Sequence, residues 1–208
     1  MISVETARSG HTILKKDGKL LASSFDPLKE ASAWAQQAIQ GLRAHDSIIV
    51  LGLGSGYHVQ ELANLVGFDR LLVIECDGEV AAEAFRLFSE LPRERVIIET
   101  DVKKMVEMDL VRDVLSGVYK IVRHAPSYSS AAAEFGAVEK LLLGRDQLSF
   151  LLQLKARPNL WALLDAEKVS TISKDECISI KTLTRLFGPK SFTQRERHLW
   201  RVLEELVL

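Results

Sequence analysis

The chain has 208 residues, of which 47% are hydrophobic and 26% are charged, and its formal net charge is −1. These values are ordinary for a globular protein and predict one sizeable domain, or one domain with a smaller appendage. The nearly neutral charge argues against a nucleic-acid partner, and the lack of a long apolar run argues against a membrane span. Because Cys76 and Cys177 show no C-x-x-C spacing, we expect a reduced, cytoplasmic setting.

The first forty residues predict a hairpin followed by a helix. Residues 12–23 have the pattern of a β-hairpin, because Asp17-Gly18 at its centre suits a two-residue type I′ turn. Asp26 then suits the N-cap of a helix whose apolar positions recur at helical spacing. Trp34 borders that apolar stripe, and we expect it to be packed rather than ligand-binding.

Residues 48–58, IIVLGLGSGYH, carry the central motif of the chain. The apolar run predicts a buried strand of a parallel sheet, and helical spacing resumes after the glycines. Strand, glycine turn and helix form the first half of a βαβ unit, in which the turn and the helix N-terminus can bind an anionic group. A tight turn without a ligand is the alternative interpretation. The predicted ligand-binding residues of this turn are Gly52, Gly54, Ser55, Gly56, Tyr57 and His58.

The spacing of the three glycines distinguishes two classes of nucleotide-binding turn. A dinucleotide fingerprint requires G-x-G-x-x-G, whereas here the third glycine comes one residue earlier. The G-x-G-x-G arrangement resembles the loop of class I S-adenosylmethionine-dependent methyltransferases. This resemblance implies S-adenosylmethionine as the cofactor, that is, a small nucleoside-type ligand bound over the turn.

Three further apolar segments predict strands that extend the parallel sheet: residues 70–76, 95–100 and 118–123. Beyond them, residues 145–208 predict helices rather than the remaining strands of a methyltransferase sheet. We therefore expect an α/β fold, a Rossmann-like (methyltransferase-type) parallel sheet with an N-terminal β-hairpin and a C-terminal helical appendage. The Rossmann-like ligand-binding domain, with its hairpin, would span residues 1–144.

Three polar side chains follow the predicted strands. Glu75 lies 19 residues after Gly56, close to the offset of about 20 at which a carboxylate meets ribose hydroxyls, with a solvated acid as the alternative. Asp101 either approaches an adenine, as the methyltransferase resemblance implies, or caps a helix expected at residues 102–116. His124 is the candidate catalytic base or hydrogen-bond donor, although a turn histidine is the preferred interpretation. No His, Cys and carboxylate cluster has metal-ligand spacing, so we expect no metal site.

The first part of the chain also resembles one protein family. Residues 24–31, SFDPLKEA, and residues 50–62, VLGLGSGYHVQEL, together resemble the amino-terminal region of motility accessory factors, a family related to 6-hydroxymethylpterin diphosphokinase-like proteins. The resemblance covers about residues 10–125 and implies a Rossmann-like module from multidomain proteins implicated in flagellin glycosylation with nonulosonic acids. The family's transferase core has its own glycine-containing site. No second such loop follows residue 60, so the resemblance places no catalytic residue on this chain.

Two functions follow from these patterns, and they leave enzymatic activity undecided. In the first, the chain is a small methyltransferase that binds S-adenosylmethionine over the turn, with Glu75 on the ribose. In the second, it is a non-catalytic binding or assembly module acting in flagellin or surface-glycan modification. The glycine turn and Glu75 favour the first function. The shortened sheet, the family resemblance and the sequence His124-Ala125-Pro126, where an amino-group methyltransferase often has an acid or Asn followed by prolines, favour the second.

The apolar helix expected near residues 147–154 predicts an additional interface. Its large apolar side chains cover more of a helix than one stripe, so it is either buried within the chain or pressed against a partner. They are Leu148, Phe150, Leu151, Leu152 and Leu154.

Our hypothesis is a homodimer held mainly by this region, since twofold homodimers are the commonest closed assembly. Light scattering at micromolar concentration should then give a dimer mass. A monomer mass would contradict it. In a dimer, Leu151→Glu should split the assembly if this side chain lies in the interface.

Overall fold

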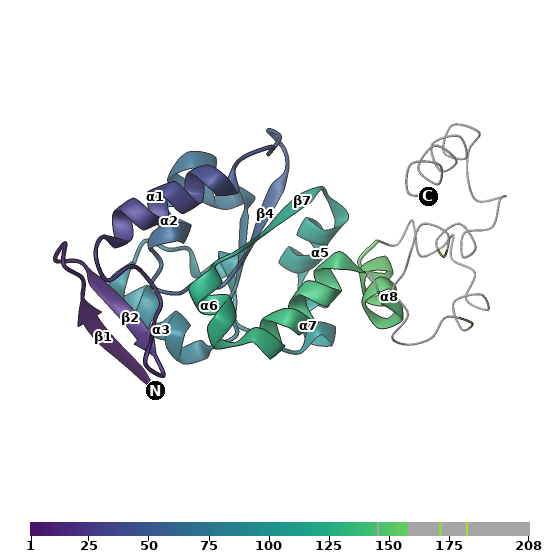
Figure 1. Cartoon of the computed structure of the whole chain (residues 1–208). Helices are drawn as coiled ribbons and strands as arrows, with labels where there is room; N and C mark the ends of the chain where they lie inside the picture. The colour runs from purple at the N-terminus through teal and green to yellow at the C-terminus, as the bar shows by residue number, and fades with distance from the viewer. Residues whose placement is uncertain (145, 158–170, 172–181, 183–208) are drawn as a thin grey trace. The chain divides into compact units, whose positions relative to one another are not determined.

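The computed structural model describes residues 1–144, 146–157, 171 and 182. The chain divides into two compact units, Met1–Ala137 and Val138–Leu208. The first unit contains a parallel sheet with its helices and a separate antiparallel sheet (Figure 1). Of the predicted C-terminal helices, α8 (Gln147–Lys155) is observed, and most of the remaining prediction lies outside the described residues.

Four parallel strands form the central sheet in the order β6-β5-β4-β7. The chain passes outward from β4 to β6 and then returns to the other side of β4, which is the order of the first four strands of a Rossmann-like sheet. Residues 48–51 of β4 are 0% exposed, as a central strand covered on both faces requires. The predicted α/β fold with a parallel sheet is therefore confirmed. The strands are β4 (Ser47–Leu51), β5 (Leu71–Ile74), β6 (Val96–Ile97) and β7 (Tyr119–Arg123).

Helices cover both faces of this sheet. Alternate strand residues point to opposite faces, and since all of residues 48–51 are buried, both faces must be covered. Ile48 and Val50 of β4 belong to a buried cluster with residues of α1, α2 and α3. Figure 1 shows α1 and α2 on one side of β4 and β7, and α5 on the other. None of the helices in the described ranges has the length and apolarity needed to cross a membrane. The helical elements that precede α8 are α1 (Pro27–Ala38), α2 (Tyr57–Val66), η1 (Phe68–Arg70), α3 (Gly78–Leu87), η2 (Arg93–Arg95), α4 (Val102–Met105), α5 (Asp109–Ser116), α6 (Ala125–Ser130) and α7 (Ala132–Leu143).

The antiparallel sheet at the N-terminus contains the predicted hairpin. Lys16 pairs with Lys19 across Asp17 and Gly18, whose φ angles are 48° and 83°. Both angles are positive, as a type I′ turn requires, so the hairpin prediction is confirmed. An additional strand, β1, pairs with β2 along its whole length and was not predicted. The strands are β1 (Ile2–Thr6), β2 (Thr12–Lys16) and β3 (Lys19–Leu20).

Other segments of the first unit differ from their predictions. β6 has two residues rather than the six expected at 95–100. The Glu99 carboxylate accepts hydrogen bonds from the backbone N–H groups of Thr100 and Asp101, and such local bonds compete with strand pairing. Residues 102–116 form two helices, α4 and α5, instead of one. The short helix α6, which begins directly after His124, was not predicted.

Candidate functional site

The glycine turn joins β4 to α2 through backbone conformations that only glycine adopts readily. Gly52, Gly54 and Gly56 have φ angles of 103°, 51° and 89°, so each lies in the left-handed region. Gly56 is also the N-cap of α2. The turn predicted from the sequence therefore exists, and its glycines satisfy a conformational requirement whether or not a ligand binds.

The carboxylate of Glu75 lies against this turn, at the end of β5. It accepts hydrogen bonds from the backbone N–H groups of Leu53 (2.8 Å), Gly54 (3.4 Å) and Asp77 (3.1 Å). Glu75 is 2% exposed, and this burial raises the pKa of its carboxyl while the backbone donors oppose the shift. The carboxylate predicted to hold a ribose thus has partners within the chain, and two of them are N–H groups of the glycine turn.

The side chains of His124 and Ser127, at the start of α6, fill the space next to Gly52 and Gly54. A Cβ atom at Gly52 would overlap the Cβ atom of Ser127, and one at Gly54 would lie 2.8 Å from Cε1 of His124. Glycine is therefore required for the close approach of α6. This arrangement does not fit S-adenosylmethionine lying across the turn, because the chain's own groups take that position. Binding of this cofactor stays a prediction.

Two other residues of the turn form hydrogen bonds to the N-terminal hairpin. The Ser55 hydroxyl, which is 1% exposed, accepts a hydrogen bond of 2.9 Å from the backbone N–H of Leu14. The Tyr57 hydroxyl donates a hydrogen bond of 2.7 Å to the carbonyl oxygen of Thr12. Both side chains were predicted to bind a ligand, and in the structure both have a partner on β2.

His58 and His124 form a buried stacked pair. Their ring centroids are 3.7 Å apart, and the ring planes differ by 8°. Nε2 of His58 donates a hydrogen bond of 2.9 Å to the Gly52 carbonyl oxygen, and Nδ1 of His124 lies 2.8 Å from the Ser127 hydroxyl oxygen. The indole ring of Trp34 meets the His58 ring edge-on at 4.9 Å.

Both imidazoles are neutral because they are buried. Burial lowers the pKa of His58 from 6.5 to about 4, although the hydrogen bond to Gly52 opposes the shift. Burial also holds the pKa of His124 well below its usual value, and the neighbouring His58 acts in the same direction. Two positive rings at this distance would repel each other, so the stacked arrangement requires uncharged rings.

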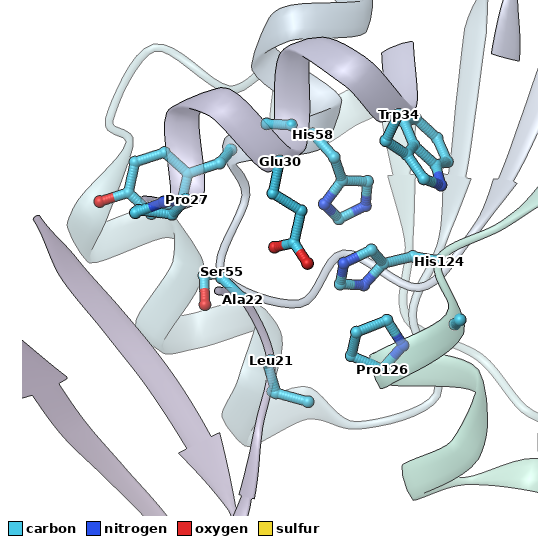
Figure 2. Close-up of a pocket in the computed structure, with 12 residues that line it drawn as sticks. Leu21, Ala22, Pro27, Glu30, Trp34, Ser55, His58, His124 and Pro126 are labelled. Atoms are coloured by element: carbon cyan, nitrogen blue, oxygen red, sulfur yellow. The ribbon is translucent and has the colours of Figure 1, made fainter. Parts of the chain in front are cut away.

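A pocket of about 150 Å³ opens beside the histidine pair (Figure 2). Residues 55–58 reach it from the turn after β4, and residues 124–126 reach it from the end of β7. β4 and β7 are the neighbouring strands between which the chain reverses its direction across the sheet. Open α/β sheets bind ligands at this topological switch point. The lining residues are Leu21, Ala22, Pro27, Glu30, Ala31, Trp34, Ser55, Tyr57, His58, His124, Ala125 and Pro126.

The predicted site residues divide into three groups. Ser55, Tyr57, His58 and His124 line the pocket, whereas the three glycines and Glu75 form the turn beside it. Asp101 is exposed and accepts a hydrogen bond from the backbone N–H of Lys103, so it is the N-cap of α4. This is the alternative that its sequence context already offered.

Three residues of the site were not predicted. Trp34 was expected to be packed, but it borders both histidines and lines the pocket. Glu30 lies on the same face of α1, one helical turn earlier, and its carboxylate extends toward the two imidazoles in Figure 2. Ser127 follows His124 at helical spacing. The only signal for that contact was Pro126, a residue favoured in the first turn of a helix.

Other chemistry finds no support in the described part of the chain. No three His, Cys, Asp or Glu side chains of the described residues are grouped so as to hold a metal ion. Burial raises the pKa of the Cys76 thiol to about 12, which leaves it protonated and poorly nucleophilic. No protein-family model matches the chain, and no curated protein matches it either. A functional assignment therefore depends on the geometry of the site.

Replacing the Glu75 carboxylate should destabilise the fold even without a ligand. In Glu75→Gln, an amide NH₂ group takes the place of an acceptor oxygen among three backbone N–H donors. We expect the free energy of unfolding to fall by about 1–3 kcal/mol, measured by chemical denaturation. The matched control Glu90→Gln changes an exposed carboxylate and should stay within about 0.5 kcal/mol of the wild type. Equal stability of the two variants would contradict a structural role for Glu75.

The neutral histidine pair should make the fold sensitive to acid. Unfolded His58 titrates near 6.5 and folded His58 near 4, so between these pH values the unfolded chain binds more protons. The contribution of neutral His58 to the free energy of unfolding is present above about pH 6.5 and is lost as the pH falls toward 4. Between pH 7 and pH 5 the loss from His58 alone is about 2 kcal/mol. His124 adds a loss of the same sign.

Denaturation curves at a series of pH values test this expectation. His58→Gln should flatten the dependence of the unfolding free energy on pH, whereas His45→Gln, which changes an exposed histidine, should preserve it. A slope that is the same in wild type and His58→Gln would show that His58 is not the titrating group.

Proposed function

We propose that this chain is a ligand-binding module of Rossmann-like fold that holds a compact molecule in the pocket at the switch point. The observation that carries the proposal is the position of two buried, neutral imidazoles in a pocket at the carboxyl ends of β4 and β7. Ligand pockets commonly lie at such switch points, with few polar groups in a mostly apolar lining. The volume of about 150 Å³ is smaller than the ~300–1,000 Å³ of typical ligand pockets, so the ligand is compact.

The same geometry favours binding over catalysis. The Ser127 hydroxyl is hydrogen-bonded to His124 in a way that could activate a nucleophile. However, Ser127 is 1% exposed and its side chain lies directly over Gly52, so no substrate reaches it. This supports a non-catalytic module, the function that the resemblance to motility accessory factors also implies.

Binding of S-adenosylmethionine by a methyltransferase-like protein is the second candidate function. It is favoured by the glycine turn after β4 and by the strand order β6-β5-β4-β7. For a nucleoside to lie over the turn, α6 would have to move away from Gly52 and Gly54, and Glu75 would have to exchange backbone partners for ribose hydroxyls. This candidate therefore requires a rearrangement, which the pocket proposal does not.

A pair of alanines on α1 provides a matched test. Ala31 is 3% exposed and lines the pocket, whereas Ala33 on the same helix is exposed. Native mass spectrometry of the purified chain should detect a copurified small molecule that is lost in Ala31→Phe and retained in Ala33→Phe. Melting curves must first show that Ala31→Phe folds, because overpacking typically costs about 1–3 kcal/mol.

Melting curves with S-adenosylmethionine and its demethylated product separate the two candidates. A ligand at 100 times its dissociation constant stabilises the fold by about 2.7 kcal/mol, which is visible as a melting shift. We expect no shift with either compound at millimolar concentration. A shift that persists in Ala31→Phe would favour the methyltransferase-like function and contradict the pocket proposal.

A further inference from the structure

The hydrogen bond of His58 assigns the proton on its ring. A carbonyl oxygen only accepts, so the 2.9 Å bond between Nε2 of His58 and the Gly52 carbonyl requires a hydrogen on Nε2. The buried ring is neutral and carries one ring proton. Nδ1 of His58 therefore holds a lone pair and can only accept a hydrogen bond.

The Ser127 hydroxyl assigns the proton on the second ring. Ser127 is 1% exposed, and among the described residues the acceptor for its hydroxyl hydrogen is Nδ1 of His124, at 2.8 Å. Buried hydroxyl groups donate to an available acceptor, so the hydrogen lies between Oγ and Nδ1 on the serine side. The neutral His124 ring consequently carries its own proton on Nε2, which is a donor.

One acceptor nitrogen on His58 and one donor nitrogen on His124 are thus left on two stacked rings that line the pocket. His58 and His124 are 4% and 5% exposed, and no described residue is hydrogen-bonded to Nδ1 of His58 or to Nε2 of His124. Among the described residues, neither nitrogen is a fully buried atom without a partner, so both are accessible from the pocket. A ligand that pairs with both nitrogens would satisfy them in place of water. We propose that the pocket binds the N–H/C=O edge of an uncharged amide, whose N–H donates to His58 and whose carbonyl oxygen accepts from His124.

The charge and size of the pocket further restrict the class of molecule that can bind. Glu30 is the single charged side chain among the described lining residues, so the lining repels anions. A carboxylate or phosphate would also lack the N–H that the His58 lone pair requires. The volume of about 150 Å³ suits a molecule of one ring. This inference rests on the proposed function, and two kinds of compound carry the required edge, a ring lactam and a primary carboxamide.

Two pairs of probes test the inference on the full chain by isothermal titration calorimetry. Uracil presents a lactam edge, and 1,3-dimethyluracil has the same ring without N–H donors. Benzamide presents a carboxamide edge, and benzoate is its anionic counterpart without N–H. We expect uracil or benzamide to bind at least about tenfold more tightly than its counterpart, the scale of one hydrogen bond to a buried group. Whichever amide binds more tightly identifies the lactam or the carboxamide form.

Two substitutions test the roles of the histidines. In His58→Gln, the side-chain amide can still donate to Gly52, but the acceptor at the position of Nδ1 is lost. In His124→Asn, the amide oxygen can still accept from Ser127, but the donor at the position of Nε2 is lost. Each substitution should weaken binding of the preferred amide by about tenfold in a chain whose melting curve remains cooperative.

The outcomes separate the inference from the proposed function. Equal binding within both probe pairs, or unchanged affinity in both histidine variants, overturns the amide assignment. If no probe binds but a copurified molecule is lost in Ala31→Phe, the amide assignment is wrong and the binding function stands. If no probe binds and no molecule copurifies, both are wrong. Should either histidine variant fail to fold, the two probe-pair comparisons on the wild-type chain decide the assignment without it.

Discussion

The rest of the site depends on the buried contact between the Glu75 carboxylate and the glycine turn. A carboxylate removed from water is stable when several N–H groups donate to it, and Leu53, Gly54 and Asp77 provide them. The same contact satisfies backbone groups that a nucleotide-binding turn leaves open for its ligand. Glu75, directly after β5, accepts hydrogen bonds from the N–H groups of Leu53 and Gly54. The side chains of His124 and Ser127 can therefore pack against Gly52 and Gly54.

That packing creates the histidine pair. The glycines allow α6 to approach the turn, which places His124 against His58 and Ser127 against His124. Each imidazole then makes one hydrogen bond within the fold. α1 contributes Trp34, which contacts both rings and donates a hydrogen bond to the Arg123 carbonyl oxygen at the end of β7. The pocket is therefore assembled from residues 21–34, the turn after β4 and the start of α6, three stretches that are distant in the sequence.

Local patterns in the sequence predicted the elements well. Asp26 caps α1 as its position suggests, and the run before Gly52 forms a buried parallel strand. These signals are local, since a cap or a strand depends on neighbouring residues. The segment near residue 95 was harder to predict: β6 ends at Ile97, and beyond it the Glu99 carboxylate accepts hydrogen bonds from the backbone N–H groups of Thr100 and Asp101.

The contacts of the site could be predicted only in part. The offset of Glu75 from the glycines predicted that its carboxylate reaches the turn, and it does. A carboxylate at this offset can accept hydrogen bonds either from ribose hydroxyls or from backbone N–H groups of the turn, so the sequence could not distinguish these partners. Trp34 lies at the border of an apolar stripe, a position that suits either a core or a pocket. The role of His124 depends on β7 lying beside β4, which is a property of the sheet rather than of the segment.

The attachment of the hairpin to the turn has a consequence for the order of folding. The two hydrogen bonds that join them, from Leu14 to Ser55 and from Tyr57 to Thr12, span 41 and 45 residues. The hairpin can close locally, but its anchoring partners are synthesised later. At a translation rate of about 5–20 residues per second, the hairpin leaves the ribosome roughly 2–9 s before the turn that holds it. During that interval Ile13 and Leu14, which point to opposite faces of β2 and are both buried in the folded chain, have no core to enter.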